Sequence, residues 1–582
     1  SRTEESLHWR NRPRVLATVR QRHRQTGRSS KSRRRGRLLI YLDAETDGLE
    51  PTRIWCVVTR ENGVNTVHTS PETLSEALRG SVSVVGHNLI GYDIPVLKRL
   101  WDVQIAPERI IDTLVLSRLS DPSKLGGHSL KQWGLTLGFP KGDYSDWSRL
   151  STEMIEYCER DVEVTEAVHM SLVQEMSDCF SPESIELEHK VQFSVQQQQR
   201  NGWTLDQELS RELCATFMER KNEIEETLQR QFRPIVHERY SDKTGKRLKD
   251  KVEVFNVGSR QQIAKRLSSL GAVFGKVTEK GNPIVDEAVL NTIELPEARL
   301  VSEYLMLQKR YAQVHSWLEH VKEDGRVHGR VISNGAITGR MTHQSPNMAQ
   351  VPSGNSEYGH ECRSCWTVPE GKKLVGFDAS GLELRMLAHY MKDKEFTDVL
   401  LTEDIHTRNQ MAAGLETRPQ AKTFIYAFLY GAGDAKIGTI VGGSAKDGER
   451  LKQRFLRNTP ALENLRERVG SASSRGYLRG LDGRRLYVRS EHAALNTLLQ
   501  AAGAIVMKKA LVLLDDYAQQ WNLNYKFIGN IHDEVQTEVS EKHAEKFGYL
   551  AVECLKAAGL AFNLRCPLDG EYKVGNTWAE TH

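Results

Sequence analysis

The sequence predicts a multidomain protein of mixed α/β and α+β class. Its 582 residues exceed what one hydrophobic core normally organises, so several domains are expected. Short apolar runs lead into acidic residues at 37–42, 374–377 and 527–531, which is typical of strands that present carboxylates at a sheet edge. Long segments with the apolar period of helices lie between these runs, for example at 298–321.

The first 37 residues are strongly basic. They hold 13 Lys/Arg and 2 Asp/Glu, whereas the other 545 residues carry 67 and 74, a net charge of −7. A segment of this composition cannot build a core, so residues 1–37 are expected to be a disordered basic tail. The tail could grip DNA through phosphate neutralisation, or it could be dispensable or an artefact of the assigned start.

The first expected domain carries acids that follow apolar runs. Asp43 and Glu45 follow the first run, and the two-residue period of a strand places them on one side. Asp93 follows a second run, and Tyr157 and Asp161 stand one helical turn apart. Acid clusters are usually solvated surface. The order D-x-E, N-x4-D and Y-x3-D is what makes this one a candidate metal site.

Two acidic segments in the C-terminal half each follow an apolar run. One run leads into Asp378, and the other leads into His532-Asp533-Glu534. Either segment alone would more often be a surface turn. Carboxylate oxygens suit Mg²⁺, and two such carboxylates can hold a pair of metals for in-line phosphoryl transfer.

A helix between these acidic segments carries cations and rings on one face. Pro419 suits a first helical turn, and Gly431 suits a stop. The residues on that face recur at every fourth position, and they are Arg418, Lys422, Tyr426 and Tyr430. Cations near a helix N-terminus favour a triphosphate, and the rings would then meet its base and sugar.

The three segments resemble motifs A, B and C of family A DNA polymerases. Residues 377–385 resemble motif A, residues 418–431 resemble motif B, and His532-Asp533-Glu534 resembles motif C. The resemblance extends from about residue 38 to residue 582 and is strongest to the replicative enzymes of T-seven-like podophages. It implies a template-directed DNA polymerase that replicates viral DNA in the cytoplasm of an infected bacterial host. It also implies a monomer that acts on primer–template DNA and deoxynucleoside triphosphates.

The resemblance assigns roles in the polymerase half. Asp378 and Asp533, with the backbone carbonyl of Ala379, are expected to bind two Mg²⁺, and Glu534 is a weaker catalytic candidate. Lys422 is expected to serve both catalysis and substrate binding. The other expected substrate contacts are a triphosphate clamp (Arg418, His406), residues around the sugar (Glu383, Tyr426, Tyr430) and readers of the minor groove (Arg340, Asn496, Gln500).

The acids of the first domain resemble those of 3′-to-5′ exonucleases of the DEDDy type. The resemblance implies an RNase H-like fold, two further Mg²⁺ and active proofreading, with Tyr157 orienting the attacking water. The expected metal ligands are Asp43, Glu45, Asp93 and Asp161.

The implied architecture is this exonuclease domain at 38–184, followed by a right-hand polymerase. The thumb is expected at 185–327, the palm at 328–400 and 504–582, and the fingers at 401–503.

Thioredoxin is a doubtful partner. Relatives of the T-seven type carry a long basic thumb insertion that captures thioredoxin. Here only residues 238–253 stand at that place, with six Lys/Arg, four Asp/Glu and a turn at Lys243-Thr244-Gly245-Lys246. Modest intrinsic processivity or a different clamp is therefore expected. The sequence does not decide whether a replicative helicase–primase is a partner.

Composition and hydropathy exclude several other classes of protein. Hydrophobic residues at 39% and charged residues at 27% are ordinary for a soluble globular protein. No uninterrupted apolar stretch approaches the roughly 18 residues of a membrane helix. Eight scattered cysteines fit a reducing cytoplasm. Three alternatives remain open at this point: a repair-type polymerase, a chain that acts mainly as an exonuclease, and a non-catalytic DNA-binding protein.

Overall fold

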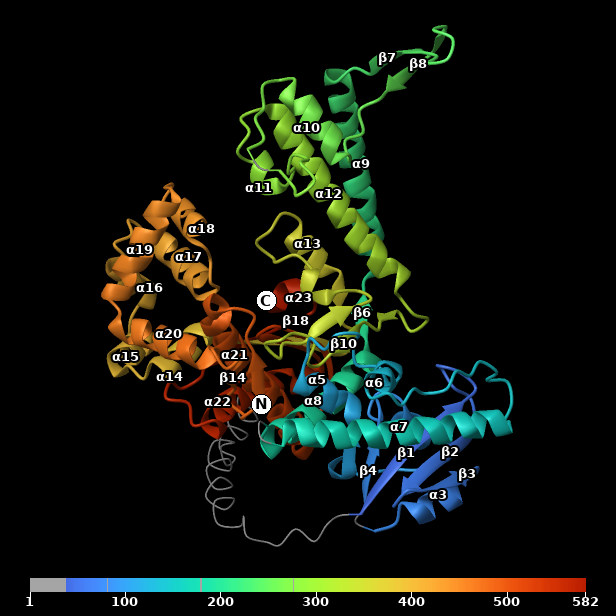
Figure 1. Cartoon of the computed structure of the whole chain (residues 1–582). Coiled ribbons are helices and arrows are strands. Elements are labelled where there is room, and N and C mark those ends of the chain that lie inside the picture. The colour runs from blue at the N-terminus through green and yellow to red at the C-terminus, as the bar shows by residue number, and fades with distance from the viewer. Residues whose placement is uncertain (1–37, 81, 178–179, 276) are drawn as a thin grey trace.

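The computed structural model describes residues 38–80, 82–177, 180–275 and 277–582 (Figure 1). The disordered tail predicted at 1–37 lies outside these residues. An N-terminal α/β domain lies at one end of the molecule, next to a central sheet from which two helical lobes rise (Figure 1).

The N-terminal domain is a five-stranded sheet of order β3-β2-β1-β4-β5. Its central strand β1 (Leu39–Thr46) pairs antiparallel with β2 (Ile54–Glu61) and parallel with β4 (Ser83–Gly86). Helix α7 (Thr152–Met176) packs across β1 and β2, where its apolar stripe covers the sheet. The other elements are β3 (Val64–His68), α3 (Pro71–Ala77), α4 (Asp93–Trp101), β5 (Ile110–Asp112), α5 (Thr113–Ser120) and α6 (Leu130–Thr136).

Helix α8 (Pro182–Asn201) joins this domain to the rest of the chain. It packs on α5 of the first domain and on α21 (Ala494–Gln520) and β16 (Tyr525–Ile531) of the central region. The boundary expected at residue 185 therefore falls inside one continuous helix, and this helix belongs with the central sheet. Periodicity finds such a helix but cannot show which domain it packs against.

A buried cluster of charges fixes α8 in place. Oε1 of Glu188 lies 2.6 Å from Nη1 of Arg484 and 2.6 Å from Nζ of Lys508 on α21. Nη2 of Arg484 also contacts Oδ2 of Asp482 at 2.6 Å. All four side chains are buried. Cross-linked ion pairs of this kind make the loss of any one partner costly, because an uncompensated charge remains inside.

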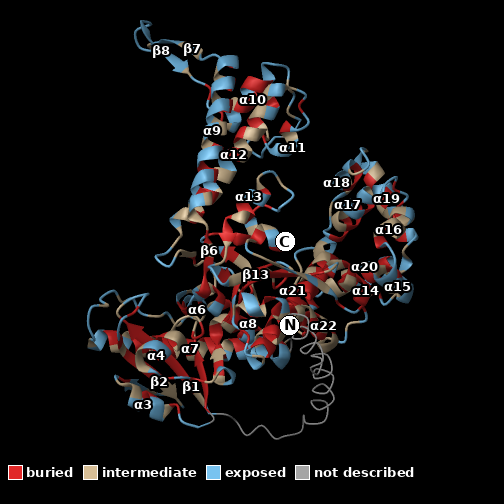
Figure 2. Cartoon of the chain, turned by 180° about the vertical axis from the view of Figure 1, so that it is seen from behind, coloured by how far each residue is buried: buried red, intermediate tan, exposed pale blue. Residues whose placement is uncertain are grey.

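The central sheet is antiparallel, with order β16-β17-β13-β18. Its strands are β13 (Lys372–Ala379), β16, β17 (Glu534–Ser540) and β18 (Gly570–Gly575). Helices α21 and α22 (Ala544–Ala561) pack together beneath it and supply much of the core, which Figure 2 shows as buried. By length and hydropathy α21 could span a membrane, but 83% of its apolar window is buried inside the protein, so it is a core helix.

The first helical lobe is built on two long antiparallel helices, α9 (Gln207–Gln231) and α12 (Pro296–Glu319). At its tip β7 (Ile235–Tyr240) and β8 (Arg247–Glu253) form the hairpin that the turn at 243–246 predicts. The hairpin is largely exposed (Figure 2). Shorter helices complete the lobe, α10 (Arg260–Ser268) and α11 (Glu287–Leu290).

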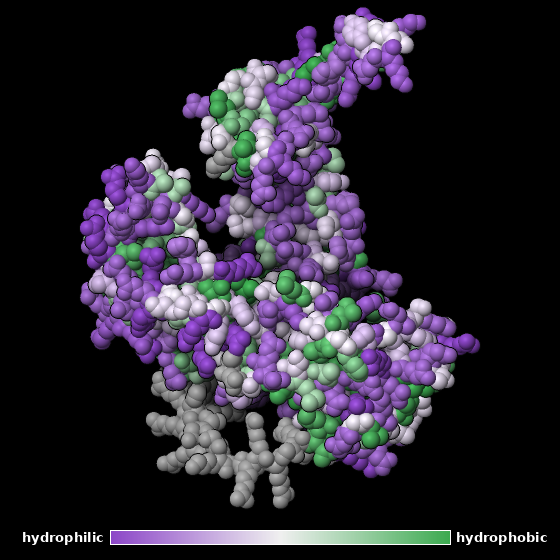
Figure 3. All heavy atoms as spheres, in the orientation of Figure 1, coloured by the Kyte–Doolittle hydropathy of each residue, from purple (hydrophilic) through white to green (hydrophobic). Residues whose placement is uncertain are grey.

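The second lobe consists of consecutive helices. Figure 3 shows the surface hollowed between the two lobes, above the central sheet, with mostly hydrophilic atoms around the hollow. The helices are α14 (Leu382–Met391), α15 (Lys394–Thr402), α16 (Ile405–Ala413), α17 (Arg418–Leu429), α18 (Asp434–Thr439), α19 (Ala445–Arg457) and α20 (Pro460–Ser473).

Short elements connect the lobes to the central sheet. They are β6 (Trp203–Leu205), β9 (Arg326–Val327), β10 (Arg330–Ile332), β11 (Thr342–Gln344), α13 (Gly359–Ser364), β12 (Trp366–Thr367), β14 (Tyr477–Arg479), β15 (Arg485–Tyr487) and α23 (Trp578–Thr581).

Candidate functional site

The acids of the central sheet meet at one edge. Asp378 is the second-last residue of β13, and Asp533 stands in the tight turn between β16 and β17. The preceding residue, His532, has φ +59°, so the turn is sharp. The amide of Ala379 donates to the carbonyl oxygen of Asp533 at 3.3 Å, which ties the turn to the end of β13.

The electrostatics of this pair suit a cation. Burial raises the pKa of Asp378 to about 7, and the neighbouring Asp533 adds to the rise. Burial also raises the pKa of Asp533, with Glu383 adding to it. Two neighbouring carboxylates whose pKa values are both raised by burial favour binding of a positive ion beside them. The carbonyl of Ala379 as a third ligand stays a prediction.

Glu534 is engaged elsewhere. Its Oε1 accepts from Nε1 of Trp578 at 2.5 Å and from Nε2 of Gln536 at 2.6 Å, and its Oε2 lies 2.7 Å from Nδ1 of His582. Burial alone would raise its pKa, but the bonds to His582 and Gln536 hold that pKa below the usual range. Glu534 therefore ties the C-terminal residues to the strand that follows Asp533.

Helix α17 has defined ends and carries two exposed cations. Thr417 and Gln420 form a capping box at its N-terminus, and Tyr430 caps its C-terminus just before Gly431 at φ +72°. The stop predicted at Gly431 is therefore found. Arg418 and Lys422 are exposed on this helix.

Arg418 is paired in this structure. Its Nε lies 2.5 Å from Oδ2 of Asp404, a residue that the sequence reasoning missed. The guanidinium holds the pKa of Asp404 well below the usual range. Asp404 also caps α16, where its side chain accepts from the amide of His406. This pairing brings Arg418 and His406 to the same place, as expected of a phosphate clamp.

The residues expected around the sugar do meet. The hydroxyl of Tyr430 donates to Oε1 of Glu383 at 2.9 Å, and Nη2 of Arg340 lies 3.5 Å from the same oxygen. The ring of Tyr426 lies 6.1 Å from that of His406, centroid to centroid. Burial and Glu383 raise the pKa of Tyr430 to about 12, so its phenol remains a donor at neutral pH.

Asn496 and Gln500 lie on the first turns of α21, and both are half-buried. They share a face of that helix, as their spacing predicts. The start of α21 adjoins the end of α17, because the carbonyl of His492 lies 3.5 Å from where a Cβ on Gly431 would stand. Contact of Asn496 and Gln500 with a minor groove stays a prediction.

The acids of the N-terminal domain also converge. Asp43 and Glu45 lie on β1, Asp93 begins α4, and Tyr157 and Asp161 lie on α7. Ligand atoms of Asp43, Glu45 and Cys158 all lie within 4.8 Å of one another. Cys158 is another residue the sequence reasoning missed, because a cysteine beside a motif tyrosine carries no spacing signal.

This second cluster is acidic and partly dehydrated. Burial and Asp161 raise the pKa of Asp43 to about 7, and burial and Asp43 raise that of Glu45 to about 10. Burial, with Asp43 adding to it, also raises the pKa of Asp93. The side chain of Asp161 is buried, and its Oδ1 has no hydrogen-bond partner among the described residues. A buried carboxylate oxygen without a partner needs a ligand, so the cluster fits a divalent cation.

Lys141 is the cation of this cluster. Its Nζ lies 2.6 Å from Oδ2 of Asp161 and 4.7 Å from the ring centroid of Tyr157. Burial alone would lower the pKa of Lys141, but Asp161 and Tyr157 hold it above the usual range. The only signal in the sequence is a basic residue ahead of Tyr144 and Trp147, and this fits no motif.

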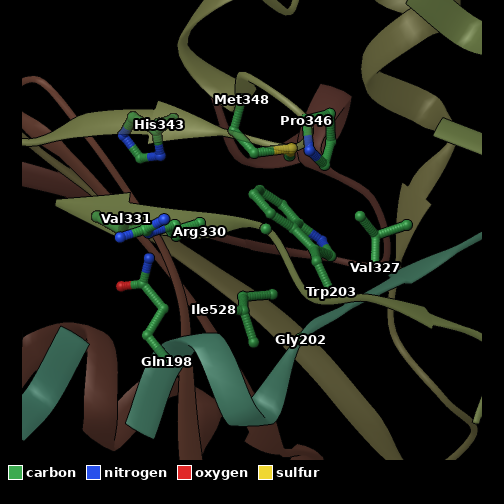
Figure 4. Close-up of a pocket in the computed structure, with 12 residues that line it drawn as sticks. Gln198, Gly202, Trp203, Val327, Arg330, Val331, His343, Pro346, Met348 and Ile528 are labelled. Carbon is green, nitrogen blue, oxygen red and sulfur yellow. The ribbon is translucent and has the colours of Figure 1, made fainter. Parts of the chain in front are cut away.

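The pocket in Figure 4 is separate from both acidic clusters. It lies where α8 ends, against Trp203, His343 and Met348, and none of the predicted site residues is among those described as lining it. Its volume is about 20 Å³, room for one water molecule. We interpret it as a packing gap.

Comparison with known proteins agrees with this geometry. Residues 219–580 match the family model described as DNA polymerase family A. The proteins described as DNA-directed DNA polymerase in Enterobacteria phage T3 and Escherichia phage T7 are each 35% identical to this chain, over 87% of it and 93% of their own length. DNA polymerase I of Aquifex aeolicus is 26% identical over 93% of this chain and 96% of its own.

A solved structure shares the fold. The POL domain of Pol1 from M. smegmatis, in complex with DNA primer-template and dNTP, aligns with a TM-score of 0.77 over 94% of this chain and 96% of that one. At 20% identity this likeness shows the fold alone.

Proposed function

Because this chain belongs to DNA polymerase family A and is a DNA-directed DNA polymerase, we propose that it copies a phage genome and proofreads its own product. The observation that carries the proposal is the presence of two separate acidic clusters in one chain. One is the pair Asp378 and Asp533 at the edge of the central sheet. The other comprises Asp43, Glu45, Asp93 and Asp161 in the N-terminal domain.

In the polymerase site, Asp378 and Asp533 would hold two Mg²⁺. These ions would lower the pKa of the primer 3′-hydroxyl and stabilise the leaving pyrophosphate. Loss of either aspartate should slow extension on the order of 10³-fold or more. These ions would also offset the charge of the two carboxylates, which would otherwise repel the incoming triphosphate.

The cations of α17 would bind the triphosphate. Lys422 is exposed, and Arg418, which pairs with Asp404 in this structure, would exchange that partner for a phosphate oxygen when the nucleotide enters. The exchange replaces one exposed ion pair with another, so it costs little. His406, at the start of α16, would donate to the same phosphates.

The substrates follow from the same geometry. The hollow between thumb and fingers would take primer–template DNA, and deoxynucleoside triphosphates would enter along α17. The M. smegmatis structure, which contains primer-template and dNTP, supports this assignment by its fold.

Processivity would depend on the chain itself. The hairpin β7–β8 carries six Lys/Arg and four Asp/Glu within 238–253 at the tip of the thumb. This short hairpin offers thioredoxin little surface to bind. Added thioredoxin should therefore leave the product length per binding event unchanged. A large increase in that length would contradict this part of the proposal.

The test is extension of a 5′-labelled primer with a mismatched 3′ end, in Mg²⁺, with and without deoxynucleotides. Wild type is compared with Asp533→Ala and with Asp43→Ala/Glu45→Ala. We expect full-length product that requires Asp533, and shortening without deoxynucleotides that requires Asp43 and Glu45. Shortening without extension would favour an enzyme that acts mainly as an exonuclease. Extension without any shortening would contradict the proposed proofreading activity.

A further inference from the structure

Lys141 enters the acidic cluster of the N-terminal domain from the loop between α6 and α7. Its ammonium lies 2.6 Å from Oδ2 of Asp161, and its side chain is only 18% exposed. Arg60, by comparison, pairs with Glu166 at 2.7 Å but does so away from the acids of the site. A lysine buried against a metal-ligating carboxylate is a costly arrangement unless it serves the site.

The charges explain why Lys141 is there. Asp43, Glu45, Asp93 and Asp161 are four carboxylates in one buried cluster, and Lys141 opposes the rise in pKa of three of them, Asp43, Glu45 and Asp161. Two divalent ions would bring four positive charges and compensate the cluster by themselves. The ammonium would then be surplus, and the nearest new anion would be the backbone of a bound DNA strand.

The backbone around Lys141 is held on both sides. Nε of Arg160 donates to the carbonyl of Pro140 at 3.0 Å. Further along the loop, the hydroxyls of Tyr144 and Ser151 lie 3.1 Å apart, and Nε1 of Trp55 donates to the carbonyl of Trp147 at 3.0 Å. The side chain of Lys141 can therefore change partner while its loop stays in place.

Aromatic rings line the same loop. The centroids of Tyr144 and Trp147 lie 5.1 Å apart, and they lie 5.7 Å and 5.8 Å from that of Tyr157. Rings of this kind stack on the bases of a single strand without regard to sequence. They would hold the end of the strand beside the ammonium of Lys141.

We propose that Lys141 is a catalytic residue of the exonuclease site and binds the scissile phosphate. It neutralises Asp161 in the metal-free protein and moves to a non-bridging phosphate oxygen when divalent ions and the strand bind. This inference rests on the proposed exonuclease activity.

The reaction it would serve is hydrolysis of the terminal phosphodiester. The oxygen of water bonds to phosphorus, and the bond from phosphorus to the 3′ oxygen of the penultimate nucleotide breaks. One water proton passes to solvent, and the departing oxygen takes up one proton. The products are a nucleoside 5′-monophosphate and a strand with a free 3′-hydroxyl. Lys141 transfers no proton and offsets the negative charge that develops on the phosphate.

The test compares Lys141→Met, which removes the charge, with Lys141→Arg, which keeps it. The matched control is Lys131→Met, which removes an exposed lysine of α6 that pairs at 3.1 Å with Asp143 of the loop that carries Lys141. Shortening of a labelled single strand is measured in single turnovers with Mg²⁺. We expect a loss of about 10²-fold or more for Lys141→Met, substantial activity for Lys141→Arg, and wild-type rates for Lys131→Met.

Two further readouts separate this role from a structural one. Mn²⁺ binding, followed by the loss of its free electron-spin resonance signal, should be as tight in Lys141→Met as in wild type, or tighter, because no ammonium competes for Asp161. Extension of a matched primer should be unchanged. Weaker Mn²⁺ binding or slower extension would show a structural role and overturn the proposal.

The role of Lys141 and the exonuclease activity are distinguished by two outcomes. If wild type shortens the strand and Lys141→Met does so within about threefold of its rate, the role of Lys141 is wrong and the exonuclease assignment stands. If wild type does not shorten it, the exonuclease assignment is wrong, and the role of Lys141 falls with it.

Discussion

The hydroxyl of Tyr430 donates to Oε1 of Glu383 at 2.9 Å, although 47 residues separate them in the chain. Tyr430 caps α17 and Glu383 lies in the first turn of α14, so the bond joins two elements beside Asp378 and Asp533. Arg340 approaches the same carboxylate oxygen at 3.5 Å. We propose that these three side chains form a wall beside the 2′ position of an incoming sugar.

Removal of this wall should relax sugar selection. We expect Tyr430→Ala to raise the kcat/KM for ribonucleotides relative to deoxynucleotides by about 10- to 100-fold, since a 2′-hydroxyl would no longer be excluded. Tyr430→Phe keeps the ring and loses only the bond to Glu383, so its effect should be smaller. Single-nucleotide incorporation kinetics measure both. An unchanged ratio in Tyr430→Ala would place the wall elsewhere.

Tyr426 should govern the use of dideoxynucleotides. It is half-buried on α17, and burial, with Glu383 adding to it, raises its pKa, so the hydroxyl remains a donor at neutral pH. That donor can replace the bond lost when a nucleotide lacks its 3′-hydroxyl. Tyr426→Phe should increase discrimination against dideoxynucleotides by about 10- to 100-fold. Chain-termination assays at fixed nucleotide ratios test this, and equal termination by both proteins would refute it.

The stability of the metal-free protein should fall as pH rises. The pKa values of Asp43 and Asp378 are raised to about 7, so the folded chain keeps protons that an unfolded chain has lost. The stability those protons provide is complete below about pH 4 and is lost as pH rises through about 7. The unfolding midpoint measured in EDTA should therefore decrease from about pH 5 to about pH 8.

Mg²⁺ should reverse most of that decrease, because it neutralises the ionised acids. The double variant Asp43→Asn/Asp378→Asn is the control, and it should show a flatter pH dependence in EDTA. A midpoint in wild type that stays level across this range would contradict the assigned cause.

The buried cluster around Glu188 should contribute strongly to stability. Glu188→Ala leaves Arg484 and Lys508 with less compensation inside the protein, at a cost of about 3–5 kcal/mol in the free energy of unfolding. Glu186→Ala is the matched control on the same helix, since its pair with Lys190 is exposed and worth only about 0.3–0.5 kcal/mol. Thermal unfolding compares them. Equal shifts in the two variants would show that the buried cluster is dispensable.

Local features of the fold were predictable from residue chemistry. Helix α17 begins at Arg418, next to Pro419, and gives way to Gly431 at φ +72°, as the residues at its ends predict. The hairpin predicted at 243–246 is present between β7 and β8. Helix α8 shows the limit, because its sequence pattern does not reveal that it packs against the central sheet across the expected boundary at 185.

The candidate sites show the same division. The order of acids, cations and rings identified most of the residues that come together, but it missed Lys141, Cys158 and Asp404. Each of these meets a site residue from a separate segment: Lys141 meets Asp161, Cys158 meets Asp43, and Asp404 meets Arg418. The spacing of residues within a short segment does not reveal such contacts between distant segments. Glu534 also lies beside Asp533 in sequence, yet its carboxylate is bound to Trp578 and Gln536.

The sequence by itself determined the chemical groups, their order along the chain and the ends of the main elements. These follow from side-chain chemistry and from backbone preferences that act over a few residues. Only the tertiary structure decided which groups are within bonding distance, which are dehydrated and how far their pKa values move. Those properties depend on packing between distant segments, and burial changes the energy of a charge more than any neighbour in sequence does.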